Sequence, residues 1–309
     1  METNIFDEVA ILFLIMAAGF YARKRGMIDG TVNRGLSELL LNITLPLMIM
    51  VSFNFDYNRE MLVTAGKLFL ISLALHVGLF FASELFYRRH PGNAKNVLRF
   101  TAMFSNCAFM GYPVLQSLYG KIGVFYASIF SVPFIIVLWT LGVKLFDGER
   151  NGVAFKKALL NPGIMAVAVG FIMFVFSLRL PAPIQRACEL VGSTTTPLSM
   201  IVVGSMLAEM RFREMLRGYS VYYGSLVRLL VIPVLVLGIL LLLGVKGTIL
   251  GICVISMAMP ASANTAAFAE KYQSDTALAS RCIFLTTILS MFTIPIIIAI
   301  MQAAIKHNL

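Results

Sequence analysis

The chain has 309 residues, of which 59% are apolar and 13% charged, and its mean hydropathy is +0.86. This composition excludes an ordinary soluble domain and indicates a helical membrane protein. The net charge of +10 does not indicate nucleic-acid binding, because the basic residues lie in short loops between apolar runs, where orientation in the membrane and anionic lipid headgroups explain them.

Taken in chain order, the apolar runs are long enough to predict an all-α polytopic membrane protein with ten transmembrane helices. The first run follows Glu2, Asp7 and Glu8 instead of basic residues, so we expect a retained helix and not a cleaved signal. The charged stretch Asp147–Lys157 is the one candidate for a central linker. The ten expected spans are 5–22, 35–54, 64–87, 95–118, 122–145, 158–179, 185–208, 218–243, 247–271 and 276–302.

Two of these runs contain an interruption, at Phe104–Pro113 and at Ala258–Thr265. Each places a helix-breaking proline, Pro113 or Pro260, beside small residues and an asparagine, so we expect a kinked or broken helix. Lipid cannot satisfy the backbone groups that a break exposes, so the break must face protein or water. Two such breaks in corresponding halves of a chain indicate a transporter binding site at the bilayer midplane.

The loops after the odd-numbered spans hold more than twice as many Lys and Arg residues as the other loops, which predicts that these loops are cytoplasmic. Both termini are then expected on the outer side, which is the periplasm for a protein of the bacterial inner membrane. The basic residues of the cytoplasmic set are Arg23, Lys24, Arg25, Arg34, Arg88, Arg89, Lys95, Arg99, Lys144, Arg150, Lys156, Lys157, Arg211, Arg213, Arg217, Lys271 and Arg281.

A weak internal repeat is also present, because the segment Thr44–Leu47 is echoed by Thr195–Leu198. Five spans is an odd number, so a second copy would enter the membrane from the opposite face. We therefore predict two inverted five-helix repeats, residues 1–150 and 151–309, related by a pseudo-two-fold axis in the membrane plane.

Several of these segments together resemble the auxin efflux carrier family. The residues Asn106-Cys-Ala-Phe-Met-Gly111-Tyr-Pro113 are similar to that family's Asn-Thr-x-x-Met-Gly-x-Pro segment, and Pro260 with Phe268–Tyr272 is similar to its ninth helix. Further similarity lies in Pro46-Leu47 with Ser52-Phe53, and in Val227-Arg228-Leu229 with Pro233.

The resemblance implies a scaffold domain of helices 1, 2, 6 and 7 and a transport domain of helices 3–5 and 8–10. Broken helices 4 and 9 would cross at the substrate site. The implied function is a secondary active transporter that moves a small organic anion, such as malate, malonate or an auxin-like acid, by an elevator-type alternating-access mechanism. A compact bacterial-type member and a homodimer through the scaffold helices are also implied. The family's plant members have a second proline where this chain has Thr265, and an acid near the start of helix 3 that is absent here.

The interruptions contain the candidate substrate ligands. Helix N-termini attract anions, and the amides of Asn106 and Asn264 add donors without charge. Ser262, Thr265 and Ser105 are weaker candidates, because such hydroxyls often bond within their own helix. The asparagines have an alternative role as helix caps, and Gly111 permits close backbone approach or plain helix packing. Pro113 and Pro260 make the breaks; Pro46 and Pro197 are expected to kink the scaffold helices near the cavity.

Three further polar residues lie inside expected spans: Arg228, His76 and Glu84. An unpaired Arg228 deep in the membrane is costly, so we expect a structural role in which it binds backbone carbonyls or pairs with Glu84. Direct binding of the anion is the alternative. His76 is expected to be a packed, hydrogen-bonded residue, with a proton relay as the alternative.

Other classes fit less well. The chain has no paired-aspartate or Gly-x-Ser-Gly protease motif, and Cys107, Cys188, Cys253 and Cys282 are too widely spaced for a zinc site or a disulfide framework. We expect no enzyme activity, no cofactor and no metal. A carrier of another substrate coupled to H⁺ or Na⁺, or a membrane sensor that does not transport, remains an alternative. Substrate identity, direction of flux and coupling ion are left open by the sequence.

Overall fold

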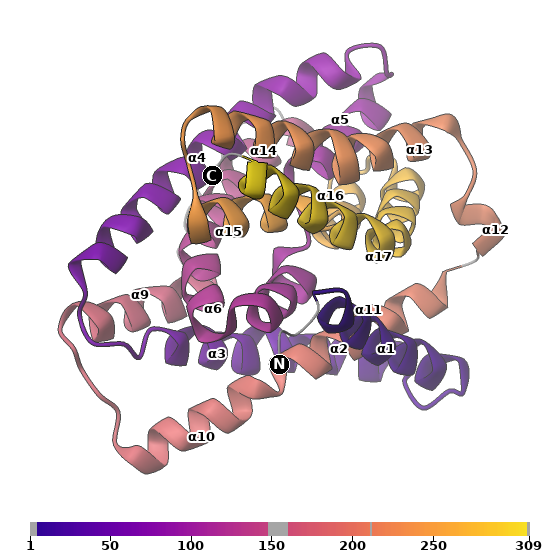
Figure 1. Ribbon diagram of the computed structural model, residues 1–309. Helices are drawn as coiled ribbons and strands as arrows, with labels where there is room; N and C mark the ends of the chain where they lie inside the picture. Colours follow the sequence, from indigo (N-terminus) through magenta and orange to yellow (C-terminus); the bar gives the residue numbers. More distant parts are fainter. Residues whose placement is uncertain (1–4, 148–159, 211, 308–309) are drawn as a thin grey trace. The chain divides into compact units, whose positions relative to one another are not determined.

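The computed structural model describes residues 5–147, 160–210 and 212–307 (Figure 1). Every regular element within these ranges is helical, and the single residues Ser105 and Ala261 form one antiparallel β-bridge. The expected all-α fold is therefore confirmed over the described ranges. The proposed linker after Asp147 and the expected repeat boundary at 150/151 lie outside the described residues.

The helical elements follow the apolar runs of the sequence. Four of the elements in the described ranges are π-helical turns, named η1 to η4. The elements are α1 (Ile5–Lys24), α2 (Gly30–Leu39), η1 (Leu40–Thr44), α3 (Leu45–Ser52), α4 (Arg59–Tyr87), α5 (Gly92–Met103), η2 (Cys107–Gly111), α6 (Tyr112–Val137), η3 (Leu138–Gly142), α7 (Val143–Asp147), α9 (Pro162–Val175), α10 (Ala182–Ser193), α11 (Thr195–Glu209), α12 (Phe212–Met215), α13 (Tyr219–Leu226), η4 (Val227–Val231), α14 (Ile232–Leu242), α15 (Gly247–Ala258), α16 (Asn264–Lys271) and α17 (Thr276–His307).

Six helical stretches of the described chain are long and apolar enough to cross a membrane, and α9 and α15 are shorter apolar helices. The chain is thus a multi-pass membrane protein by length and composition of its helices. The six stretches are Gly30–Ser52, Arg59–Tyr87, Cys107–Phe146, Ala182–Glu209, Tyr219–Leu242 and Thr276–Lys306. The count of ten spans and the inverted relation of two repeats stay predictions.

The stretch Cys107–Phe146 is interrupted at Gly120, whose φ of 60° and ψ of −144° are not helical. A residue with a side chain is strained at such a positive φ, whereas glycine adopts it freely. The interruption coincides with the short connection that the sequence predicts between the runs 95–118 and 122–145.

Proline residues explain the position of three π-helical turns. The turns η1, η2 and η4 each end two residues before a proline, namely Pro46, Pro113 and Pro233. Proline donates no hydrogen bond and its ring collides with the carbonyl one turn earlier, so a wider turn in front of it relieves the collision. Pro113 therefore lies next to a distorted turn, inside the predicted interruption Phe104–Pro113. It is the second residue of α6, and the break lies earlier, at Phe104–Asn106.

The described helices belong to two compact units. Unit 1 comprises Met1–Lys67, Ala108–Val132 and Lys157–Met210; unit 2 comprises Leu68–Cys107, Pro133–Lys156 and Arg211–Leu309. Each unit is therefore assembled from both halves of the sequence. The chain passes between the units inside α4, η2 and α6.

In unit 1, α1 packs along α11, and α3 packs against α9 and α10 (Figure 1). The first pair is close because Gly19 and Gly204 lie in its contact. A Cβ at Gly204 would fall on the carbonyl oxygen of Met16, and one at Gly19 on that of Ile201. Small residues let the backbones of membrane helices approach in this way. An ion pair between Arg23 and Glu209 joins the same two helices.

In unit 2, the long helix α17 contacts α5, α13, α15 and α16. An aromatic cluster fills the space beside α5, where the Phe100 ring lies 4.5 Å from that of Phe104 and 4.9 Å from that of Phe268. Gly142 faces the Phe100 and Phe104 rings, where a Cβ would come within 3.1 Å of them. These contacts pack α5 against α16. The first interruption follows α5 and the second precedes α16, so both helices adjoin the candidate site.

Candidate functional site

Two extended segments of unit 2 meet where α5 and α15 end. After Met103 the chain continues through Phe104, Ser105 and Asn106 without a helical turn, and Pro260–Ser262 does the same after α15. The Asn106 N–H donates to the Pro260 carbonyl at 2.8 Å, and the Ser262 N–H donates to the Phe104 carbonyl at 3.0 Å. The two interruptions that the sequence predicts are therefore hydrogen-bonded to each other as a minimal antiparallel pair.

This pairing satisfies part of the backbone that the breaks expose. The N–H of Ala261 donates to the Thr286 hydroxyl of α17 at 3.1 Å, and that hydroxyl donates to the Cys282 carbonyl at 2.6 Å. Thr286 has no accessible surface. Thr286 is not among the residues predicted from the sequence, because a threonine in an apolar helix carries no signal that distinguishes support for a neighbouring break from bonding within its own helix.

Arg228 lies in η4 and is fully buried. Its guanidinium donates three hydrogen bonds to main-chain carbonyls: Nε to Met259 at 3.0 Å, Nη1 to Ala102 at 2.7 Å and Nη2 to Met257 at 3.0 Å. The carbonyls of Met257 and Met259 belong to the end of α15, and that of Ala102 belongs to the end of α5. One side chain thus binds the C-terminal ends of both interrupted helices.

The electrostatics of this arrangement are favourable. The C-terminal end of a helix carries unpaired carbonyls and a partial negative charge, and two such ends converge on the guanidinium. Charge-assisted hydrogen bonds to three acceptors offset the cost of burying the cation. The planar fork of arginine suits this task, because it reaches three carbonyls at fixed angles.

The predicted ligands on this crossing differ in exposure. Asn106, Ser262 and Thr265 are buried, whereas Asn264 is exposed as the first residue of α16. Ser262 acts as a local cap, since its hydroxyl accepts from the Asn264 N–H at 3.2 Å. Ser105 lies within 3.0 Å of the Cys107 thiol. The paired segments and the first turn of α16 bring together four of the predicted residues: Ser105, Asn106, Ser262 and Thr265.

The hydroxyl of Thr265 differs from those of Ser105 and Ser262 in its hydrogen bonding. It has no accessible surface, and its hydroxyl has no hydrogen-bond partner among the described residues. A buried hydroxyl without a partner costs free energy, so a position that retains one is a candidate for contact with a ligand. The N–H of Thr265 donates to the Ser262 carbonyl at 3.0 Å, which fixes it in the first turn of α16.

The remaining predicted residues of the breaks and scaffold lie in unit 1. Gly111 is the last residue of η2 and Pro113 follows in α6. Pro46 is the second residue of α3, directly after η1, and Pro197 lies in the first turn of α11. Pro46 and Pro113 thus follow closely on the π-helical turns η1 and η2, which accommodate their rings, and Pro197 lies within the first turn of α11.

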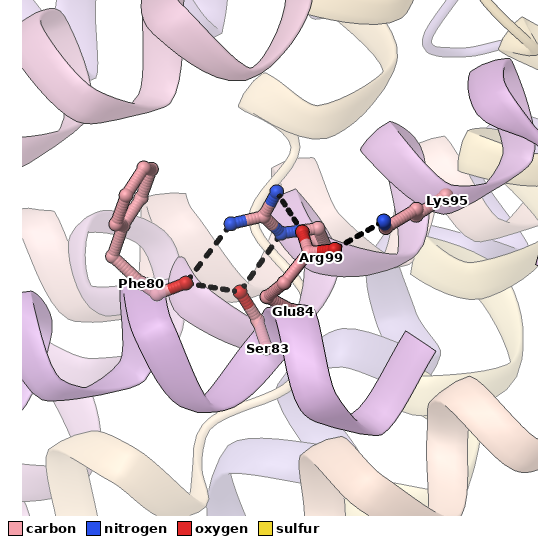
Figure 2. A network of polar contacts seen from close by, with 5 residues as sticks. All are labelled: Phe80, Ser83, Glu84, Lys95 and Arg99. Atoms are coloured by element: carbon pink, nitrogen blue, oxygen red, sulfur yellow. Dashed lines mark hydrogen bonds and ion pairs between the residues drawn. The ribbon is translucent and has the colours of Figure 1, made fainter. Parts of the chain in front are cut away.

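Glu84 pairs with two cations of unit 2 instead of with Arg228 (Figure 2). It contacts Lys95 and lies 2.7 Å from Arg99, and the Arg99 guanidinium also donates to the Phe80 carbonyl at 2.9 Å and to the Ser83 hydroxyl at 3.1 Å. This network joins the end of α4 to α5. Glu84 therefore lies in a contact between these helices and not at the crossing.

His76 is fully buried in α4. Its Nδ1 lies 2.7 Å from the Ser72 carbonyl, which only accepts, so this nitrogen carries a proton. The ring packs edge-on against Phe134 at 5.4 Å. These contacts are those of a packed, hydrogen-bonded histidine. No group of three potential metal ligands is found among the described residues.

The fold and this crossing define a class: a multi-pass helical membrane protein in which two interrupted helices meet at a buried arginine. The family described as membrane transport protein matches residues 4–155 and 149–298 of the chain. The chain belongs to this family, and the resemblance to the auxin efflux carriers is confirmed.

Several related proteins are also described as transporters. An uncharacterized transporter of Methanothermobacter thermautotrophicus is 25% identical over 300 residues, covering 94% of this chain and 96% of the relative. One from Methanocaldococcus jannaschii is 22% identical over 303 residues, covering 93% and 96%. The uncharacterized transporter YfdV of Escherichia coli K12 is 24% identical over 252 residues, covering 77% and 78%. The chain is accordingly a membrane transporter of about the same length as these relatives.

Proposed function

We propose that the protein is a secondary active carrier that moves a small organic anion across the cell membrane by alternating access. The observation that carries the proposal is the crossing in unit 2, where Arg228 holds two helix C-terminal ends by three hydrogen bonds. Interrupted helices and a buried cation are costly in a membrane protein, so their presence suggests a function. The function that we propose is binding of the substrate at the N-terminal ends of the helices that follow the two breaks.

The chemistry at those ends favours an anion. The segments Val97–Tyr119 and Gly247–Ala269 contain no Asp or Glu, so no carboxylate repels an anion or binds a cation there. The chain restarts as a helix directly after each extended segment, and helix N-termini attract negative charge. The amide of Asn106 and the hydroxyls of Ser262 and Thr265 would bind a carboxylate by hydrogen bonds, with Asn264 and Pro260 completing the site within unit 2.

The architecture that we propose for transport has ten spans in two inverted repeats. The grouping of α1, α2, α3, α9, α10 and α11 in unit 1 supports a scaffold of helices 1, 2, 6 and 7. Unit 1 also contains Ala108–Val132, whereas the family resemblance assigns helices 4 and 5 to the transport domain. In an elevator mechanism unit 2 would carry the anion. A homodimer through the scaffold and a carboxylate substrate such as malate, malonate or an auxin-like acid follow from the family resemblance.

Substrate identity is the first experimental question. A panel of mono- and dicarboxylates is screened by thermal unfolding of the purified protein, because a ligand that binds the folded state raises its apparent stability. Hits are then tested as labelled substrates in proteoliposomes, with and without gradients of H⁺ and Na⁺. Saturable uptake of a carboxylate supports the proposal. Binding without flux would make the protein a sensor, and uptake of cations but of no anion would overturn the proposal.

Asn106→Ala tests the site itself. If Asn106 binds the substrate, this change should weaken binding by about 1–3 kcal/mol, the usual loss for a buried hydrogen bond to a charged group. The melting temperature is measured with and without substrate, so that an effect on folding is separated from an effect on binding. The matched control is Asn42→Ala, because the Asn42 amide bonds only within its own helix, to the Glu38 carbonyl. An unchanged substrate-induced shift in Asn106→Ala would restrict Asn106 to helix capping.

A further inference from the structure

A polar cavity lies in unit 2, and none of the residues of the crossing lines it. It has a volume of about 570 Å³ and lies where α4 ends and α13 begins. Two arginines, a histidine and two tyrosines supply its polar lining, and α4 adds two apolar residues. The lining residues are Arg88, Arg89, His90, Tyr219, Tyr223, Leu85 and Phe86.

Aromatic contacts fix the walls of this cavity. The His90 ring stacks on Tyr223 with centroids 5.7 Å apart, and Tyr223 stacks on Tyr219 at 6.1 Å. The Tyr223 hydroxyl donates to the Phe86 carbonyl at 3.1 Å, which joins α13 to the end of α4. The cavity is therefore built by side chains that hold one another in place, and not by a chance gap between loops.

Its positive charge is not neutralised by the described part of the protein. Neither Arg88 nor Arg89 forms an ion pair with a described acid. Glu84, one helical turn before Arg88, is already bound by Lys95 and Arg99 (Figure 2). The Nδ1 atom of His90 is buried and lacks a partner among the described residues. Two guanidinium groups and this nitrogen suit a ligand with several anionic oxygens, such as a phosphate.

An apolar groove continues from this cavity along the same helix. It has a volume of about 330 Å³, lies between α4 and α14, and every residue that lines it is apolar. Phe86 lines both the groove and the polar cavity. Ile71, Gly78 and Ala82 of α4 and Leu235 and Ile239 of α14 form much of its wall. The polar cavity and the apolar groove together form one site with a cationic end and a long apolar end.

We propose that this composite site binds an anionic phospholipid, with its phosphate at Arg88, Arg89 and His90 and one acyl chain in the groove between α4 and α14. Arg88 follows the last residue of α4, a helix of 29 residues that is long enough to cross the membrane, so the cationic end lies at the depth of the headgroups. Basic residues at this depth attract anionic lipids. A soluble anion would bind in the polar cavity but would make no contact with the apolar groove.

The headgroup end is tested with delipidated full-length protein and native mass spectrometry, titrated with phosphatidylglycerol or phosphatidylcholine. The wild type should bind phosphatidylglycerol more tightly. The pair Arg88→Gln and Arg89→Gln should weaken this binding at least about tenfold, because both cations that attract the phosphate are removed. Lys24→Gln with Arg25→Gln is the control, because these adjacent exposed cations at the end of α1 line neither space.

The groove is tested by Gly78→Leu, which should fill it. A Cβ at Gly78 meets nothing within 4 Å, so the substitution has room and should not disturb folding. Gly66→Leu, at an equally open glycine of α4 outside the groove, is the control. Gly78→Leu should weaken phosphatidylglycerol binding several-fold, and Gly66→Leu should not.

Inorganic phosphate distinguishes a lipid from a free anion. If millimolar phosphate raises the melting temperature as much as phosphatidylglycerol does, and Gly78→Leu leaves lipid binding unchanged, the cavity is an anion site and the lipid proposal is wrong. Equal affinity for both lipids, or no effect of Arg88→Gln with Arg89→Gln, would also overturn it. Should that double variant not fold, Arg88→Lys with Arg89→Lys keeps the charge but loses the planar forks, and should weaken binding to a smaller extent.

Discussion

At the scale of single residues, the contacts of Arg228 are those of a structural side chain. All three of its hydrogen bonds go to main-chain carbonyls at the ends of α5 and α15. A ligand that used the same guanidinium would have to replace one of these bonds. We infer that Arg228 holds the crossing together and leaves anion binding to uncharged groups.

Arg228→Met tests this assignment. It removes the charge and leaves three buried carbonyls without a donor, so it should lower the free energy of unfolding by about 3–5 kcal/mol, even without substrate. Arg228→Lys keeps the charge and should retain part of the stability. Both are measured by thermal or denaturant unfolding in detergent. If Arg228→Met has normal stability but no longer responds to substrate, the arginine itself binds the anion.

Thr265 allows a second test at this scale. Thr265→Val replaces a buried hydroxyl that has no described partner by a methyl group of similar size. The substrate-free protein should become slightly more stable, by up to about 1 kcal/mol, because an unsatisfied polar group is removed. Substrate binding should weaken. Thr195→Val in α11 is the control, since its hydroxyl is equally buried and unpartnered. A loss of stability in Thr265→Val would indicate that its hydroxyl is satisfied in the protein.

At the scale of elements, the contact between α1 and α11 depends on two glycines. A side chain at Gly204 would collide with the Met16 backbone, and backbone atoms of a helix cannot move aside as the end of a flexible side chain can. The pair therefore forms a rigid part of unit 1, which suits the scaffold role that we propose for these helices.

Gly204→Ala should lower the stability of the protein by about 1–3 kcal/mol, the usual cost of overpacking. Gly238→Ala is the matched control, because a Cβ there meets nothing within 4 Å, and it should be neutral or slightly stabilising through higher helix propensity. The measurement is the melting temperature in one detergent. Equal melting temperatures for the two variants would mean that α1 and α11 do not pack as closely as described.

At the scale of the whole molecule, the orientation in the membrane stays a prediction from the distribution of basic residues. Single cysteines at Arg59 and Lys246 should react with an impermeant maleimide added to intact cells. Cysteines at Arg34 and Arg89 should react only after the membrane is permeabilised. Cys188→Ser provides the background, because the other three cysteines are buried. The reverse pattern would place the termini in the cytoplasm and contradict the predicted orientation.

The sequence by itself determined the class of protein, the family and the positions of both interruptions. These features depend on local chemistry: long apolar runs need a membrane, and a helix cannot continue unchanged through proline and small polar residues. The sequence also predicted that Arg228 needs acceptors, because an unpaired charge in an apolar span is too costly.

The tertiary structure alone decided which groups satisfy those needs. The acceptors of Arg228 are main-chain carbonyls, which every residue has and no side-chain pattern reveals. Likewise, Glu84 pairs with Lys95 and Arg99 because α5 returns beside the end of α4. Within the predicted interruption Phe104–Pro113, the extended residues are Phe104–Asn106, because η2 accommodates Pro113 and the pairing with Pro260–Ser262 stabilises the extended chain. Such partners come from distant parts of the chain, so folding has to bring them together before they can be identified.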